Sequence, residues 1–217
     1  MSPGLKAYYK FRSSSSPESF KFILDIINKK RLFCADWKKL NDPMEGIFTY
    51  ARLSNSEDNN ENLGTIAIEK SKIKICSLSK DLNNYLLWCH YASGFHGVAI
   101  KISLNPGHKN LKEVKYSPEL CHTNFCSSLS QLPLSAEEIL CSKLKVWEYE
   151  KEYRILNDNQ YFDIEKNDGR IDEVIVGPRL RECEIKFNRL KSACNKYKIA
   201  ISTVNIDNTG GITTVKL

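Results

Sequence analysis

The sequence predicts an α+β fold in which a mixed, mainly antiparallel sheet is flanked by helices. Segments with the aromatic or β-branched composition of strands outnumber the strand–helix–strand units that a doubly wound parallel sheet needs. Apolar residues make up 41% of the 217 residues and charged residues 27%, which is ordinary for a globular chain. No window approaches the ~18 apolar residues of a membrane span. We expect one globular domain over residues 1–217.

The N-terminal quarter predicts two strands and a helix. Residues 7–12 alternate like a strand, and 17–28 show helical spacing of apolar side chains after a serine-rich turn and a proline. A second strand is expected over 31–34. Pro43, at the end of 41–43, breaks any continuation, because the residue before a proline avoids the helical region. The polar stretch 54–64 is rich in Asn and Asp and is expected to be a surface loop.

The middle of the chain predicts strands over 73–78 and 97–102, with a helix over 82–91 between them. A further strand over 113–116 is expected to pair beside the second of these, and 122–134 is expected to be a connecting loop.

The C-terminal part predicts a helix over 135–145, because Ser135 and Glu138 have the spacing of a capping box. The elements expected after it are strands over 150–156 and 173–176, a helix over 181–197 and a last strand over 199–204.

Eight cysteines are dispersed along the chain without a signal peptide, so we expect reduced thiols and a cytoplasmic location. Cys121, His122 and Cys126 come nearest to zinc spacing but form no paired Cys-x-x-Cys knuckle. We therefore predict no metal site from the cysteines.

The strongest local signal lies between Trp147 and Arg154. In a strand, alternation places Glu150, Glu152 and Arg154 on one face. A carboxylate there would bond a ribose hydroxyl or stabilise a cationic transition state if the face lines a cleft. On an exposed face the same residues are a solvated charge ladder.

Two weaker signals precede it. Tyr85, Trp88 and Tyr91 form an aromatic stripe on the helix after Ser77-Leu78-Ser79, and such a stripe is more often core than a binding surface. His90 is likewise more often structural than catalytic. The turn over 40–46 contains Asn41 and Asp42, whose side chains either bond their own backbone or contact ligand hydroxyls.

Four motifs, in this order, resemble a bacterial family known as domain-of-unknown-function family 2971. The likeness runs from about residue 8 to residue 180, and the family name assigns no activity. Its motifs are Tyr8-Tyr9-Lys10-Phe11-Arg12, Phe33 through Asn41-Asp42-Pro43-Met44-Glu45, Ser77-Leu78-Ser79 with Trp88-x-His90-Tyr91 and Gly97-Val98-Ala99-Ile100, and Trp147-x-Tyr149-Glu150-Lys151-Glu152-Tyr153-Arg154.

The same order of motifs is more distantly similar to ADP-ribosyltransferases, which implies NAD as substrate. By that likeness Glu152 or Glu150 is the catalytic carboxylate, which bonds the nicotinamide ribose and favours an oxocarbenium-like transition state. The implied NAD-contacting residues are Lys10 or Arg12 near the adenosine, Ser77 and Ser79 as braces, Tyr85 or Tyr91 against nicotinamide, and Asn41, Asp42, Trp88, His90 and Arg154 in the remaining motif positions.

Two other functions compete with NAD-dependent ADP-ribosyl transfer or NAD hydrolysis. A net charge of +6, with basic residues dense in 29–31 and 179–198, favours a non-catalytic nucleotide or nucleic-acid binding module. The carboxylates of Asp42, Glu45, Glu150 and Glu152 would suit a metal-dependent hydrolase if they converge. The acceptor of a transferred group, whether nucleic acid, protein or water, is not encoded in any motif.

Overall fold

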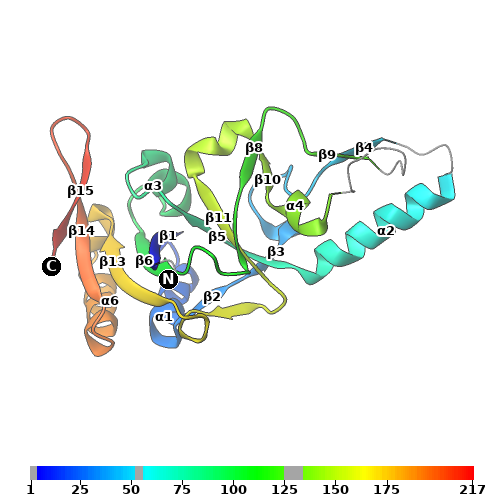
Figure 1. Ribbon diagram of the computed structural model, residues 1–217. Coiled ribbons are helices and arrows are strands. Elements are labelled where there is room, and N and C mark those ends of the chain that lie inside the picture. The colour runs from blue at the N-terminus through cyan, green and yellow to red at the C-terminus, as the bar shows by residue number, and fades with distance from the viewer. Residues whose placement is uncertain (1–3, 52–55, 125–133) are drawn as a thin grey trace. The chain divides into compact units, whose positions relative to one another are not determined.

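The computed structural model describes residues 4–51, 56–124 and 134–217, and its elements form the predicted α+β fold (Figure 1). One domain over residues 1–217 is expected from the sequence, whereas the contacts divide the chain into two compact units. Unit 1 comprises Met1–Leu32, Leu78–His108 and Phe162–Leu217, and unit 2 comprises Phe33–Ser77 and Lys109–Tyr161. Each unit is therefore assembled from segments that are far apart in the sequence.

Unit 1 is built on a sheet with the strand order β15-β14-β13-β6-β1. Strand β6 pairs antiparallel with β1 and β13, β13 pairs parallel with β14, and β14 pairs antiparallel with β15. The pairing is thus mixed and mainly antiparallel, as predicted. The strands are β1 (Lys6–Arg12), β6 (Val98–Leu104), β13 (Arg170–Val176), β14 (Ala200–Ile206) and β15 (Ile212–Lys216).

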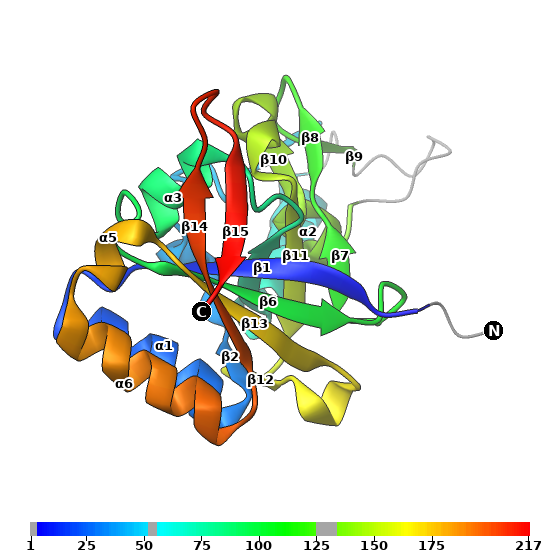
Figure 2. The ribbon, with the colours of Figure 1, turned by 90° about the vertical axis from the view of Figure 1, so that its left-hand side faces the viewer.

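The central position of β6 follows from its composition, because all of its residues except Lys101 are buried. Burying one such aliphatic side chain contributes about 1.5–3 kcal/mol to folding. The helices of unit 1 are α1 (Pro17–Lys29), α3 (Tyr85–Tyr91), α5 (Pro178–Arg181) and α6 (Glu184–Lys196). Helix α1 begins where Ser16 accepts a hydrogen bond from the Ser19 amide, and α1 packs against α6 (Figure 2).

Unit 2 contains β11 (Glu152–Asn157) paired antiparallel with β7 (Leu111–Glu113), and β3 (Ala35–Asp36) paired antiparallel with β5. Strand β5 (Lys74–Ser79) passes its last two residues into unit 1, where Ser79 pairs with Tyr9 of β1. Two small parallel pairs complete unit 2: β10 (Ser142–Leu144) with β8 (Lys115–Ser117), and β4 (Thr49–Ala51) with β9 (His122–Asn124).

The helical elements of unit 2 are the 3₁₀ turns η1 (Trp37–Lys39) and η2 (Lys145–Glu150) and the helices α2 (Ser56–Lys72) and α4 (Ala136–Leu140). Its core includes Ile75, Leu140, Cys141 and Leu156. The elements that remain in the chain are β2 (Arg31–Phe33), β12 (Tyr161–Asp163) and η3 (Glu165–Asn167).

The predicted segments 54–64 and 135–145 differ from the structure. The loop expected over 54–64 is wrong from residue 56 onward, because α2 starts there and buries Ile66 against Ile139 of α4. The capping box of Ser135 and Glu138 is confirmed, but α4 ends at Leu140 rather than at 145, and a short strand follows. The tertiary pairing of β10 with β8 overrides local helix propensity there.

The region after residue 110 also differs from expectation. The strand expected over 113–116 beside β6 is instead two strands, of which β7 pairs with β11 and β8 with β10. The loop expected over 122–134 begins with β9, and residues 125–133 lie outside the described residues.

Within the described ranges, no helix combines the length and apolarity that crossing a bilayer requires. Every cysteine that the structure describes is unpaired with another cysteine.

Candidate functional site

Three carboxylates and two cations meet inside unit 2. Arg154, on β11, donates from Nη1 to Glu45 Oε2 at 2.8 Å and from Nη2 to Glu45 Oε1 at 2.5 Å. The same guanidinium donates from Nε to Glu152 Oε1 at 2.8 Å and from Nη2 to Glu152 Oε2 at 3.0 Å. One arginine thus holds two carboxylates through charge-assisted bidentate pairs.

Lys143 of β10 supplies the second cation. Its Nζ lies 2.6 Å from Glu150 Oε2, 3.2 Å from Glu152 Oε2 and 3.5 Å from Glu45 Oε1. We call Glu45, Lys143, Glu150, Glu152 and Arg154 the charge cluster. Its most exposed member, Lys143, shows only 7% of its surface, so these charges are compensated by one another rather than by bulk water.

The cluster keeps Glu152 and Lys143 ionised. Burial by itself raises the pKa of Glu152, but the charges of Arg154 and Lys143 and the hydrogen bonds from Arg154 and Ser77 outweigh burial and lower that pKa to about 2. Burial by itself lowers the pKa of Lys143, but the charges of Glu152 and Glu150 outweigh it and raise that pKa. At neutral pH Glu152 is therefore a carboxylate and Lys143 an ammonium group.

Glu45 reaches the cluster from a tight turn. Asp42 Oδ1 accepts a hydrogen bond from the Met44 amide at 2.9 Å, and the Glu45 amide donates to the Asp42 carbonyl at 3.1 Å. The predicted turn is thus present, and Asp42 is buried and bonds its own backbone rather than facing outward.

The residue after Glu45 requires glycine. Gly46 has φ +66°, and a Cβ at this position would lie 2.9 Å from Trp37 Cε3. Lys70, near the end of α2, donates to the Gly46 carbonyl at 2.5 Å and lies 4.3 Å from the centroid of the Trp37 ring. Helix α2 and η1 therefore fix the turn that presents Glu45.

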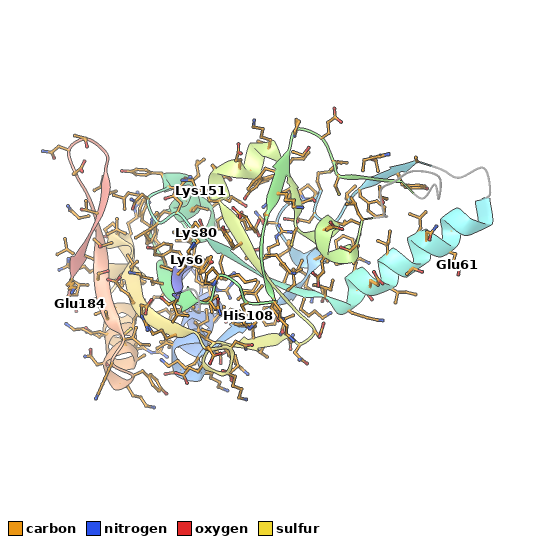
Figure 3. The ribbon with its side chains drawn as sticks, in the orientation of Figure 1. Lys6, Glu61, Lys80, His108, Lys151 and Glu184 are labelled. Carbon is orange, nitrogen blue, oxygen red and sulfur yellow. The ribbon has the colours of Figure 1, made fainter. Side chains whose placement is uncertain are left out.

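Contrary to the prediction, Glu150 does not lie on the strand. Strand β11 begins at Glu152, Glu150 ends η2, and Lys151 between them is exposed with a left-handed φ of 42° (Figure 3). The expected alternation therefore holds for Glu152 and Arg154 only. Glu150 still reaches the cluster because η2 directly follows the strand that carries Lys143.

Two hydroxyl groups contact Glu152. Tyr116 Oη accepts a hydrogen bond from the Glu152 amide at 2.8 Å, and burial raises the pKa of this phenol to about 12. Ser77 of β5 hydrogen-bonds the Glu152 side chain. The serine that the ADP-ribosyltransferase likeness places as a brace thus contacts a predicted catalytic glutamate.

Two aromatic rings lie beside the charge cluster on η2. Trp147 and Tyr149 are both half-buried, and their ring centroids are 6.1 Å apart. Lys143 Nζ lies 4.8 Å from the centroid of the Trp147 ring, and the neighbouring Val146 is 72% exposed. The cluster therefore approaches the surface of unit 2 through an aromatic segment.

The aromatic stripe of α3 belongs to unit 1, and of its three residues Trp88 lies in the core, whereas Tyr85 is exposed and Tyr91 is half-buried. Trp88 is fully buried, donates from Nε1 to the Leu82 carbonyl at 2.8 Å and stacks on Phe95. Tyr85 is 38% exposed, and its hydroxyl donates to the Gly210 carbonyl at 2.6 Å. The contacts of Trp88 and Tyr85 thus give both residues structural roles in unit 1.

His90 and Tyr91 lie at the end of α3, where His90 is exposed and Tyr91 is half-buried. The Ser79 hydroxyl, also in unit 1, accepts a hydrogen bond from the Asp81 amide at 2.9 Å and so stabilises the turn after β5.

The remaining predicted residues are dispersed. Lys10 of β1 pairs with Ile100 of β6. The Arg12 guanidinium lies 5.3 Å from the centroid of the Phe22 ring. Lys10 and Arg12 are therefore both in unit 1. Asn41 lies in unit 2 and is exposed. Of the predicted NAD-contacting residues, Ser77 and Arg154 contact Glu152, one of the two predicted catalytic glutamates.

Sequence reasoning missed Lys143, because it lies in the segment expected to be helical. Its only local signal is the alternation of Ser142-Lys143-Leu144, which is too short to distinguish a strand from the end of a helix.

A metal-dependent hydrolase would require Asp42, Glu45, Glu150 and Glu152 to converge. The three glutamates converge around Lys143 and Arg154, which balance their charge, whereas Asp42 Oδ1 accepts a hydrogen bond from the Met44 amide of its own turn. In the part of the chain that the structure describes, no group of three or more His, Cys, Asp or Glu is arranged to hold a metal ion. Cys126 of the nearest zinc spacing lies outside that part.

Comparison with known proteins adds no assignment. No protein-family model matches the chain, and no curated protein or solved structure matches it.

Proposed function

We propose that this protein cleaves the bond between nicotinamide and ribose in NAD, as an ADP-ribosyltransferase or an NAD hydrolase, at the charge cluster. The observation that carries the proposal is the charge balance of the cluster beside two aromatic rings. Glu45, Glu150 and Glu152 bring three formal negative charges, and Lys143 and Arg154 bring two positive ones. One negative charge is in excess.

The excess negative charge of the cluster suits cleavage of the bond between nicotinamide and ribose. The nicotinamide ring of NAD is a cation, and positive charge moves to the ribose as the ring leaves. A carboxylate held in place by buried partners stabilises such a transition state without reorganising. The half-buried rings of Trp147 and Tyr149 offer flat surfaces for the nicotinamide.

The geometry favours Glu150 over Glu152 as the catalytic carboxylate. Both oxygens of Glu152 accept hydrogen bonds from Arg154, and the second also accepts one from Lys143. Glu152 therefore acts as a positioning residue. Glu150 lies at the end of η2, whose Val146 and Glu148 are exposed.

Access to Glu150 requires movement, because only 4% of this residue is exposed. We propose that Trp147 and Tyr149 turn outward when the substrate enters and then cover it. The order of motifs that resembles ADP-ribosyltransferases supports the same chemistry, and the free thiols support a cytoplasmic location.

The test is incubation of the purified chain with NAD, alone and with DNA, RNA or protein as acceptor, while nicotinamide release is followed. Release without an acceptor indicates NAD hydrolysis, and release that depends on one indicates transfer to it. Unchanged release in the presence of a chelator excludes the metal-dependent route. No release in any arm contradicts the proposal.

A further inference from the structure

The net positive charge of this protein is concentrated in two segments of unit 1, residues 17–30 with helix α1 and residues 178–198 with helices α5 and α6. Residues 17–30 contain three basic and two acidic residues, and residues 178–198 contain seven basic and two acidic ones. Their combined excess of six positive charges equals the formal net charge of the whole chain, +6, so the rest of the chain is balanced. Helices α1 and α6 pack against each other in unit 1 (Figure 2), so the two basic segments are neighbours, and we call their exposed side chains the α1–α6 surface.

Most of these charges face solvent. The exposed basic residues of the surface are Lys21, Lys29, Arg179, Arg181, Arg189, Lys191, Lys196 and Lys198. Cation–π contacts tie two basic side chains across the helix pair: the guanidinium of Arg189 lies 5.5 Å from the Phe20 ring centroid, and Lys30 Nζ lies 4.4 Å from that of Tyr197. The seam between the helices is therefore basic as well.

We propose that this α1–α6 surface binds the phosphodiester backbone of a nucleic acid. Each helix has 13 residues and is therefore about 20 Å long, which matches about six phosphates along one strand of a duplex. Exposed amides and a hydroxyl lie between the charges and can donate to phosphate oxygens, namely Asn28, Asn188, Ser192 and Asn195.

The same surface fits an anionic membrane poorly. A helix that lies in a bilayer interface needs a continuous apolar face besides its basic one. On α6 the exposed positions include one large apolar residue, Ile185, and on α1 one, Phe22. The apolar faces of both helices are used inside unit 1, by Ile23 and Ile27 of α1 and Leu190 of α6.

Binding is tested by fluorescence anisotropy with a labelled DNA duplex and, separately, a labelled single-stranded RNA, both about 20 nucleotides long to match the helix length, over a series of salt concentrations. The test variant of the full chain carries Lys191→Gln and Lys196→Gln, two exposed positions of α6. The control carries Lys72→Gln and Lys109→Gln, which are exposed in unit 2 and remove the same charge. Circular dichroism checks that both variants fold.

The surface predicts salt-sensitive binding to at least one of the two probes, and the two arms show whether DNA or RNA is preferred. The Lys191/Lys196 variant should bind about tenfold more weakly at low salt, with a salt slope reduced by about 1.4–1.8 for two lost phosphate contacts. The Lys72/Lys109 control should change affinity less than about twofold.

Equal weakening in both variants would show attraction by net charge alone and overturn the inference, as would absence of binding to both probes. Binding to phosphatidylserine vesicles without binding to either nucleic acid would also overturn it, in favour of a membrane. The inference does not depend on NAD chemistry. The Lys191/Lys196 variant should release nicotinamide at the rate of the unchanged chain, so the two proposals fail separately.

Discussion

Glu45 and Arg154 are 109 residues apart in sequence, yet they form a buried two-bond ion pair within unit 2. The pair joins the turn before β4 to β11, so the two segments of unit 2 depend on each other. Lys143, Glu150 and Glu152 extend it into the charge cluster, which is therefore both a structural element and the proposed site.

Replacing Glu45 by Gln should strongly destabilise the fold, because it removes one carboxylate from the buried guanidinium of Arg154. The expected loss of unfolding free energy is about 3–5 kcal/mol, measured by urea denaturation. Glu148→Gln, which changes an exposed glutamate, should stay within about 0.5 kcal/mol. Similar losses of unfolding free energy in both variants would show that the Glu45–Arg154 pair stabilises the fold no more than an exposed glutamate does.

Gly46→Ala should destabilise the chain by about 1–3 kcal/mol, because it strains a residue at φ +66° and places a methyl group against Trp37. The matched change Gly64→Ala lies within α2 with no atom within 4 Å, and it should stabilise by about 0.5–1 kcal/mol. Thermal melting of the two variants checks the opposite signs. A stable Gly46→Ala protein would mean that this turn tolerates another conformation.

Acid should weaken the fold through Glu152. Its pKa is about 2 in the folded chain against an ordinary value of 4.5, so its contribution is complete above pH 4.5 and is lost as the pH falls toward 2. That contribution is on the order of 3 kcal/mol. Urea denaturation at pH 6, 4 and 3 measures it, and a Glu152→Gln protein should show a shallower decline. Parallel declines in the two proteins would contradict the assigned pKa.

Trp88→Ala should cost about 3–5 kcal/mol of unfolding free energy, because Trp88 is fully buried between Phe11 and Phe95. His90→Ala, two residues later on the exposed side of α3, should cost less than about 0.5 kcal/mol. A tolerated Trp88→Ala would argue for a binding role instead of a core role.

Elements with a strong periodic pattern and local end signals could be predicted from the sequence. Helix α1 follows from apolar spacing, Ser16 and Pro17, and β6 follows from a nearly continuous apolar run. Strands β9 and β10 were not predicted, and the strand expected over 113–116 gave neither the division into β7 and β8 nor their partners. Each of these strands is three residues long and exists through pairing with a segment distant in sequence.

The candidate site was predictable only in part. Glu152 and Arg154 share a face because strand alternation places them there. Glu150 does not, because the 3₁₀ turn η2 and the left-handed Lys151 interrupt the strand. The contributions of Glu45 and Lys143 depend on tertiary structure, and no local pattern in one sequence reveals which distant carboxylate a buried arginine will meet.

The most direct measurement of the central claim is the rate of nicotinamide release from NAD by the unchanged chain, by Glu150→Gln and by Glu148→Gln. The two variants lose the same charge within η2, and Glu150 belongs to the charge cluster while Glu148 is exposed. We expect release by the unchanged chain and by Glu148→Gln at similar rates, and a loss of at least about 100-fold in Glu150→Gln with the fold retained. Equal rates in the two variants would contradict the assignment of the charge cluster as the site of NAD chemistry.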